Sequence, residues 1–127
     1  MTPMAGAEYP VTRAVARREL EFQNAEGARV RVVVRLGQPR RDPAHPGDWV
    51  CPYDIHGFSK PYRRWASGID SMQALALAYH IIPTELGALA QREGGGTVLF
   101  LGAAGTGYGE DGCRLVLDQG DTVGAVE

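Results

Sequence analysis

The chain has 127 residues, with 13 lysines and arginines, 15 acidic residues and a formal net charge of -2. This length fits one domain of ordinary size, which can bury a core without metals or disulfides. A hydrophobic fraction of 44% and a charged fraction of 22% exclude an intrinsically disordered chain. The charge balance also argues against nucleic acid as a partner, because such proteins carry a net basic field.

Two strands are predicted after a loose arm over residues 1–12. In 14–22, Leu20 and Phe22 share one face, and in 29–36 an apolar face alternates with arginines. Ala25-Glu26-Gly27 fits a three-residue hairpin loop between them. The resulting register pairs Phe22 with Val30, Glu21 with Arg31 and Leu20 with Val32, and the buried face of the second strand is expected to contain Val30, Val32, Val34 and Leu36.

Two further strands are predicted after a loop over residues 37–48. The third covers 49–55, with Trp49, Cys51, Tyr53 and Ile55 on one face and Asp54 on the other. A turn over 56–61 leads to the fourth strand, 62–67, which ends at Gly68.

A long helix is predicted from Asp70 or Ser71 to Arg92, because either residue is a good N-cap. Pro83 lies inside this segment and predicts a kink or a division near His80. The apolar positions recur at helical spacing, with Leu77 and Ile81 widening an arc formed by Met72, Leu75, Tyr79, Ile82, Leu86 and Leu89.

Strands at 97–101 and 113–117 follow, joined by a glycine-rich loop over 102–112. Four strands, one helix and two strands predict an α+β domain over residues 13–118, followed by a flexible tail over 119–127. We expect a mainly antiparallel sheet of about five to six strands, with the long helix packed on one face.

Gly102-Ala103-Ala104-Gly105-Thr106-Gly107 follows a predicted strand, as a dinucleotide-binding turn does. Such a site needs a helix whose N-terminus faces the pyrophosphate. Here two acids and two more glycines follow instead, and too few residues remain for a mononucleotide-binding unit. We therefore interpret the segment as a hairpin loop and expect no cofactor.

Asp54 and His56 lie two residues apart on one strand face, a spacing that would let them share a proton, or share a metal with a third ligand such as His45 or Glu110. The favoured interpretation is a solvated strand edge.

Cys51 and His80 raise the question of a thiol nucleophile with its base. Cys51 is expected to face inward and His80 to face solvent, which favours neither metal binding nor catalysis.

Arginine supplies nearly all the positive charge, and Lys60 is the only lysine. This bias is typical of a GC-rich bacterial genome; the alternative is selection for bidentate anion binding by guanidinium groups. No secretory signal or transmembrane span is visible, so we expect a cytoplasmic protein with reduced cysteines. A removed signal peptide would make Cys51 and Cys113 candidates for a disulfide.

The stretch Trp49-Val-Cys-Pro-Tyr-Asp-Ile-His-Gly57, followed by Gly68-Ile-Asp-Ser-Met-Gln-Ala-Leu-Ala-Leu-Ala78, resembles a family of small uncharacterised bacterial domains. The resemblance covers residues 17–92 and implies a single domain. It implies no activity and no catalytic residues. The residues themselves explain the second stretch structurally, since Asp70 or Ser71 caps the helix and Gln73 can complete a capping box.

Two functions follow as hypotheses. The first is a non-enzymatic interaction module that binds another protein, indicated by the lack of a catalytic constellation, the arginine-rich strand face and the glycine-rich loop. Arginines and aromatic residues also favour protein interfaces, and they cluster at Arg40, Arg41, Tyr62, Arg63, Arg64 and Trp65, although a plain surface is the favoured interpretation of this cluster. The alternative is a small-molecule-binding protein or enzyme with a site between helix and sheet. Neither nucleic acid nor a membrane is an expected partner. The candidate binding residues are Tyr53, His56, Arg63, Arg64, Trp65 and His80.

Overall fold

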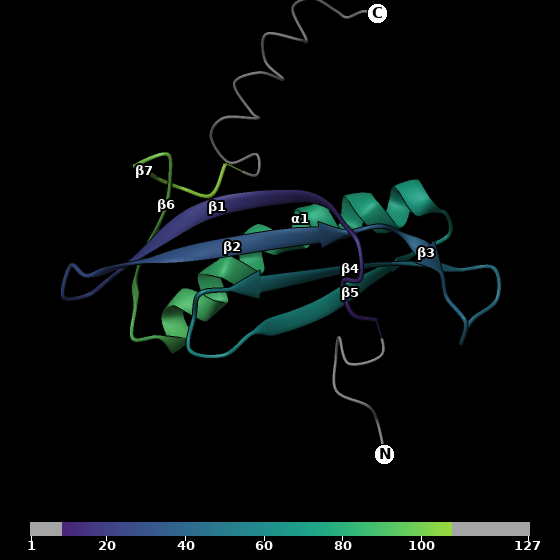
Figure 1. Ribbon diagram of the computed structural model, residues 1–127, viewed down its shortest axis with the longest axis horizontal. Coiled ribbons are helices and arrows are strands. Elements are labelled where there is room, and N and C mark those ends of the chain that lie inside the picture. The colour runs from purple at the N-terminus through teal and green to yellow at the C-terminus, as the bar shows by residue number, and fades with distance from the viewer. Residues whose placement is uncertain (1–8, 108–127) are drawn as a thin grey trace, which may run out of the picture.

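The computed structural model describes residues 9–107 and contains, within them, one helix packed on one face of an antiparallel sheet (Figure 1). This is the predicted α+β class, with slightly more strands than expected. The elements in chain order are β1 (Ala14–Asn24), β2 (Arg29–Gly37), β3 (Arg40–Arg41), β4 (Trp49–His56), β5 (Tyr62–Gly68), α1 (Ser71–Arg92), β6 (Gly96–Phe100) and β7 (Ala103–Ala104).

The sheet is built around β4, β2 and β1. β5 pairs along β4, while β2 and β3 also pair with β4, and β1 lies between β2 and β6. The predicted hairpin register is confirmed, since Phe22 pairs with Val30 and Leu20 with Val32. Gly27 supplies the positive φ of 91° that the turn requires. The expected strand at residues 113–117 lies outside the described residues.

The two short strands β3 and β7 form inside segments predicted as loops. Each contains two residues, too short for an alternating pattern to be visible in the sequence. β7 pairs with β6, so the described part of the glycine-rich segment is a hairpin and no helix begins in it through Gly107. β6 ends before Leu101, whose φ of 55° breaks the extended backbone.

Alanines carry much of the contact between α1 and the sheet. Ala74, Ala78, Ile82 and Leu86 are fully buried, whereas Met72 is 78% exposed. The expectation that Met72, Leu77 and Ile81 belong to the buried arc is therefore wrong. Small side chains let the helix approach closely: a Cβ on Gly68 would lie 2.5 Å from the backbone nitrogen of Ala74.

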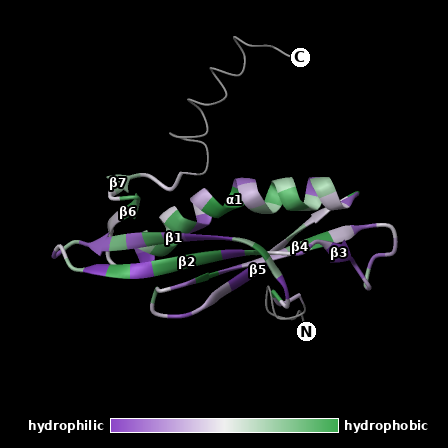
Figure 2. Cartoon of the chain, turned by 45° about the horizontal axis from the view of Figure 1, so that its top comes forward, coloured by the Kyte–Doolittle hydropathy of each residue, from purple (hydrophilic) through white to green (hydrophobic). Residues whose placement is uncertain are grey.

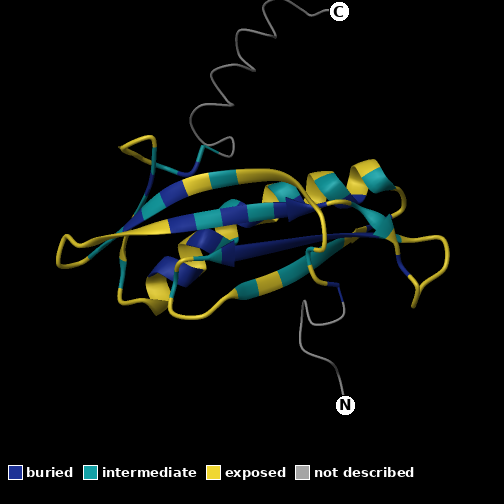
Figure 3. Cartoon of the chain, viewed as in Figure 1, coloured by how far each residue is buried: buried dark blue, intermediate teal, exposed yellow. Residues whose placement is uncertain are grey.

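Two other expectations are corrected by the packing. Val30 is 45% exposed because it lies beside the hairpin turn, whose tip is exposed, whereas Val32 and Val34 are buried (Figure 3). The helix is continuous from Ser71 to Arg92, so Pro83 does not divide it. Burial of Ile82 and Leu86 on either side of the proline supplies packing that offsets the lost backbone bond.

The start of the described chain packs against the sheet. Within the predicted arm, the Tyr9 side chain is 5% exposed and stacks edge-on against Trp65, with 4.7 Å between ring centroids. Its hydroxyl donates a 2.6 Å hydrogen bond to Asp42, in the loop between β3 and β4. This bond and that of Ala44 N–H lower the pKa of the buried Asp42 carboxyl.

Candidate interaction surface

The first turn of α1 is fixed by two reciprocal hydrogen bonds. The Asp70 carboxylate accepts from the backbone N–H of Gln73 at 2.8 Å, and the Gln73 side chain accepts from the backbone N–H of Ile69 at 2.8 Å. Asp70 is therefore the N-cap, as the sequence allowed, and the capping-box partner is Ile69 rather than the cap itself. Ile69 and Met72 flank this capped start and are 72% and 78% exposed.

Met72 belongs to a continuous apolar surface with two hollows. One has a volume of about 340 Å³ and is bordered by Leu36, Tyr79 and His80, and the other, of about 300 Å³, is bordered by Pro39 and Trp49. Both are lined by Met72 and Leu75. Figure 2 shows hydrophobic bands alternating with hydrophilic ones along α1. We call this area the Met72 surface, defined as Leu36, Pro39, Trp49, Met72, Leu75 and Tyr79.

Arginine borders the Met72 surface on the β3 side. The guanidinium carbon of Arg41 lies 5.1 Å from the centroid of the Trp49 ring, and that of Arg40 lies 5.8 Å from the Tyr9 ring. Both arginines come from β3, but as neighbours in a strand they point to opposite faces of the sheet, so only Arg41 lies beside the Met72 surface. An exposed apolar area with a cation and an aromatic ring at its margin has the chemistry of protein interfaces.

A carboxylate bridges two tyrosines between α1 and the sheet. Glu85 accepts hydrogen bonds from the hydroxyls of Tyr53 at 2.8 Å and Tyr62 at 2.6 Å. Burial and these bonds raise the pKa of both phenols, that of Tyr62 to about 12. The Arg64 guanidinium stacks 4.3 Å from the Tyr62 ring centroid. The donors and the carboxylate satisfy one another, so this group acts as a clasp between helix and strands.

On the opposite face of the sheet, Asp54 is buried rather than solvated. Its side chain is 2% exposed and accepts two bonds from Arg35, at 2.9 and 2.6 Å. These bonds raise the pKa of Arg35. The favoured interpretation of Asp54 and His56 as a solvated edge is wrong for Asp54, because β4 is paired on both sides by β2 and β5.

His56 is the second neighbour of this carboxylate. Its Nε2 lies 3.1 Å from Asp54 Oδ1, and this buried nitrogen has no well-aligned hydrogen bond within the described residues. Among residues 9–107, no group of three or more His, Cys, Asp or Glu residues could hold a metal ion. His45, the proposed third ligand, instead contacts Asp42 at 3.2 Å, and Glu110 lies outside the described residues.

The six candidate binding residues lie in separate places. Tyr53 and Arg64 belong to the clasp at Glu85 and Tyr62, while His56 and Arg63 are on the other sheet face. Trp65 packs against Tyr9 on that other face, and His80 is exposed beside the Met72 surface. The structure thus brings Tyr53 and Arg64 together through Tyr62, and it separates the other four from them.

Cys51 and His80 are also apart. Cys51 is fully buried, its thiol lies 3.3 Å from the carbonyl oxygen of Gly37, and burial raises its pKa to about 11. His80 is exposed on the helix.

In the described part of the chain, no helix is long and apolar enough to cross a membrane.

Sequence reasoning missed the Met72 surface because a helical period does not say which of two apolar stripes faces the sheet. Ala74 and Ala78 repeat at the same spacing as the larger side chains, and this was the available signal for a closely packed seam. Glu85 was missed because nothing local indicates that β4 and β5 place two tyrosines beside it.

A family model described as a domain of unknown function matches residues 16–111. No curated protein and no solved structure matches the chain.

Proposed function

The chain belongs to the DUF6968 family of domains of unknown function, and from that premise we propose that it is a non-enzymatic module that binds another protein through the Met72 surface. The observation that carries the proposal is the exposure of Met72, at 78%, between two apolar hollows. Ile69, next to the helix start, is 72% exposed. A large apolar surface that is rimmed by polar residues is typical of a site that a partner covers.

The chemistry of the surface indicates the chemistry of the partner. The hollows suit apolar side chains, and Arg41, which stacks on Trp49, lies at the margin of one of them. Residues 9–107 contain twelve lysines and arginines and nine acids, a net charge of +3. The partner we propose therefore presents apolar side chains flanked by acidic residues, because opposite charge favours both encounter and register.

The geometry gives less support to the alternative, a small-molecule site between helix and sheet. Such a site needs polar groups that converge on an open pocket. Tyr53 is 3% exposed and already bonded to Glu85, and His56 lies on the other face of the sheet.

For the setting we infer the bacterial cytoplasm, which the arginine bias and the free thiol of Cys51 support.

The test compares Met72→Glu with Leu77→Glu, which places the same charge on another flank of α1. Both residues are exposed, so both variants should fold with a free energy of unfolding within about 0.5 kcal/mol of the wild type. Each chain is used at micromolar concentration to capture partners from the native lysate, and captured proteins are quantified. The purified partner is then titrated against all three chains.

We expect one partner to be captured by the wild type and by Leu77→Glu and to bind Met72→Glu at least about tenfold more weakly, because a buried methionine contact is replaced by a desolvated carboxylate. Capture of no protein by the wild type would contradict the proposal. Equal loss in both variants, or none in either, would place the binding surface elsewhere.

A further inference from the structure

Among the strands that the structure describes, the outer edge of β1 is paired over only part of its length. β2 pairs with β1 from Ala14 to Gln23, whereas on the other side β6 pairs only from Glu21 to Asn24. Within residues 9–107, no strand pairs with residues 14–20 on that side. A strand edge of this length is a template for another extended segment, and native proteins usually cover such an edge.

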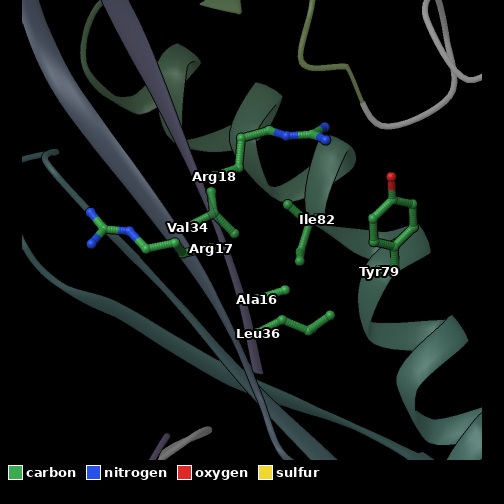
Figure 4. Close-up of a pocket in the computed structure, with 7 residues that line it drawn as sticks. All are labelled: Ala16, Arg17, Arg18, Val34, Leu36, Tyr79 and Ile82. Atoms are coloured by element: carbon green, nitrogen blue, oxygen red, sulfur yellow. The ribbon is translucent and has the colours of Figure 1, made fainter. Parts of the chain in front are cut away.

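A hollow opens beside the same edge, between β1 and α1. Its volume is about 60 Å³, and apolar side chains from three elements line it, namely Ala16, Leu36 and Tyr79 with Val34 and Ile82. Figure 4 shows Arg18 on the α1 side of β1 and Arg17 on the other side. A strand added to this edge would direct alternate side chains toward the hollow.

The described part of the chain ends at this edge. The Arg18 guanidinium donates hydrogen bonds to the carbonyl oxygens of Thr106, at 3.2 Å, and Gly107, at 2.6 Å. Twenty residues follow Gly107 in the sequence. The six steps from Gly107 to residue 113 can span at most about 20 Å, which brings residue 113 within reach of the edge near Arg18.

Charge is distributed unequally between these two parts of the chain. Residues 108–127 contain five acids and one arginine, a net charge of -4, whereas residues 9–107 carry +3. The β1 edge is basic, because Arg13, Arg17 and Arg18 precede its single acid, Glu19. Glu19 is already bonded to Arg17 at 2.9 Å and to Arg31 at 2.7 Å. The edge is therefore complementary in charge to the C-terminal residues.

We propose that the outer edge of β1 is the docking site of the chain's own C-terminal segment, with residues 113–117 added beside residues 14–20. In this segment Cys113, Leu115 and Leu117 alternate with Arg114 and Val116. Alternation places the first three on one side of the added strand, and the hollow at Ala16, Leu36 and Tyr79, of about 60 Å³, has room for one of them, Leu115. The acids on either side of the segment, Glu110, Asp111 and Asp118, lie in reach of the basic edge.

The test compares hydrogen exchange in the full-length wild type, Leu115→Asp and Val123→Asp, followed by NMR. Both variants add one negative charge to the C-terminal residues, so their difference isolates the apolar contact. We expect outward-facing amides of residues 14–20 to exchange about tenfold faster in Leu115→Asp than in the other two chains, since a buried leucine is lost. Amides shared between β1 and β2 report whether the fold is intact.

Contacts in the wild type supply the second measurement, which does not depend on how a variant folds. Nuclear Overhauser effects between residues 14–20 and 113–117 are expected, and their absence would overturn the proposal. Equal exchange at the β1 edge in all three chains would overturn it too. Protection that grows with protein concentration would identify a second copy as the occupant and also contradict it.

Discussion

Replacing Arg35 with methionine is expected to destabilise the domain more than replacing its partner Asp54 with asparagine. The side chain of Asp54 is 2% exposed and that of Arg35 is 39% exposed. Arg35→Met leaves a buried carboxylate without its bonds of 2.9 and 2.6 Å, at a cost of about 3 kcal/mol in free energy of unfolding. Asp54→Asn leaves a guanidinium that water can reach, and costs about 1 kcal/mol.

The assay is urea-induced unfolding followed by tryptophan fluorescence, with linear extrapolation to water. Both variants should keep the denaturant dependence of the wild type, because the surface exposed on unfolding barely changes. Equal destabilisation by the two substitutions, or a larger effect of Asp54→Asn, would refute the reasoning. It would mean that burial of the carboxylate contributes little to the cost.

Three further predictions concern titration and capping. The pKa of Tyr62 is raised from 10.0 to about 12, so the folded domain retains a proton that the unfolded chain loses between pH 10 and 12. The free energy of unfolding, measured by urea titration at each pH, should therefore fall over this range, and it should fall less in Tyr62→Phe. Cys51 should resist thiol reagents at pH 8 until the chain is unfolded, because its pKa is about 11 and it is buried; rapid labelling of Cys51 in the native Cys113→Ser variant would contradict this. Asp70→Ala should cost about 1 kcal/mol of stability by loss of the N-cap, whereas Asp70→Asn should cost less.

Local patterns were enough to predict most of the fold. The β1–β2 register follows from matching faces across the three-residue turn, and the pairing of Phe22 with Val30 agrees with it. The helix bounds follow from Asp70 and the glycines after Arg92. What failed was the depth of burial at particular positions. Val30 and Met72 have the right polarity for a core, but both lie where the opposing element does not cover them.

The candidate surface and the buried charges depend on contacts far apart in sequence. Asp54 is buried because β2 supplies Arg35, 19 residues earlier, and β5 pairs on its other side. Glu85 meets Tyr53 from 32 residues away. A single sequence shows these side chains as isolated polar residues in periodic segments, so their partners could not be read from it. The Met72 surface likewise joins α1 to Pro39 and Trp49 from separate segments.

The most direct measurement of the account is the oxidation rate of the Met72 thioether in the native lysate compared with that in the purified chain. Met72 is 78% exposed, so dilute peroxide should oxidise it rapidly in the isolated protein, with added free methionine as the internal standard. If a partner covers the Met72 surface, the rate in the lysate should be several-fold lower after normalisation. Equal normalised rates in the two samples would contradict the account.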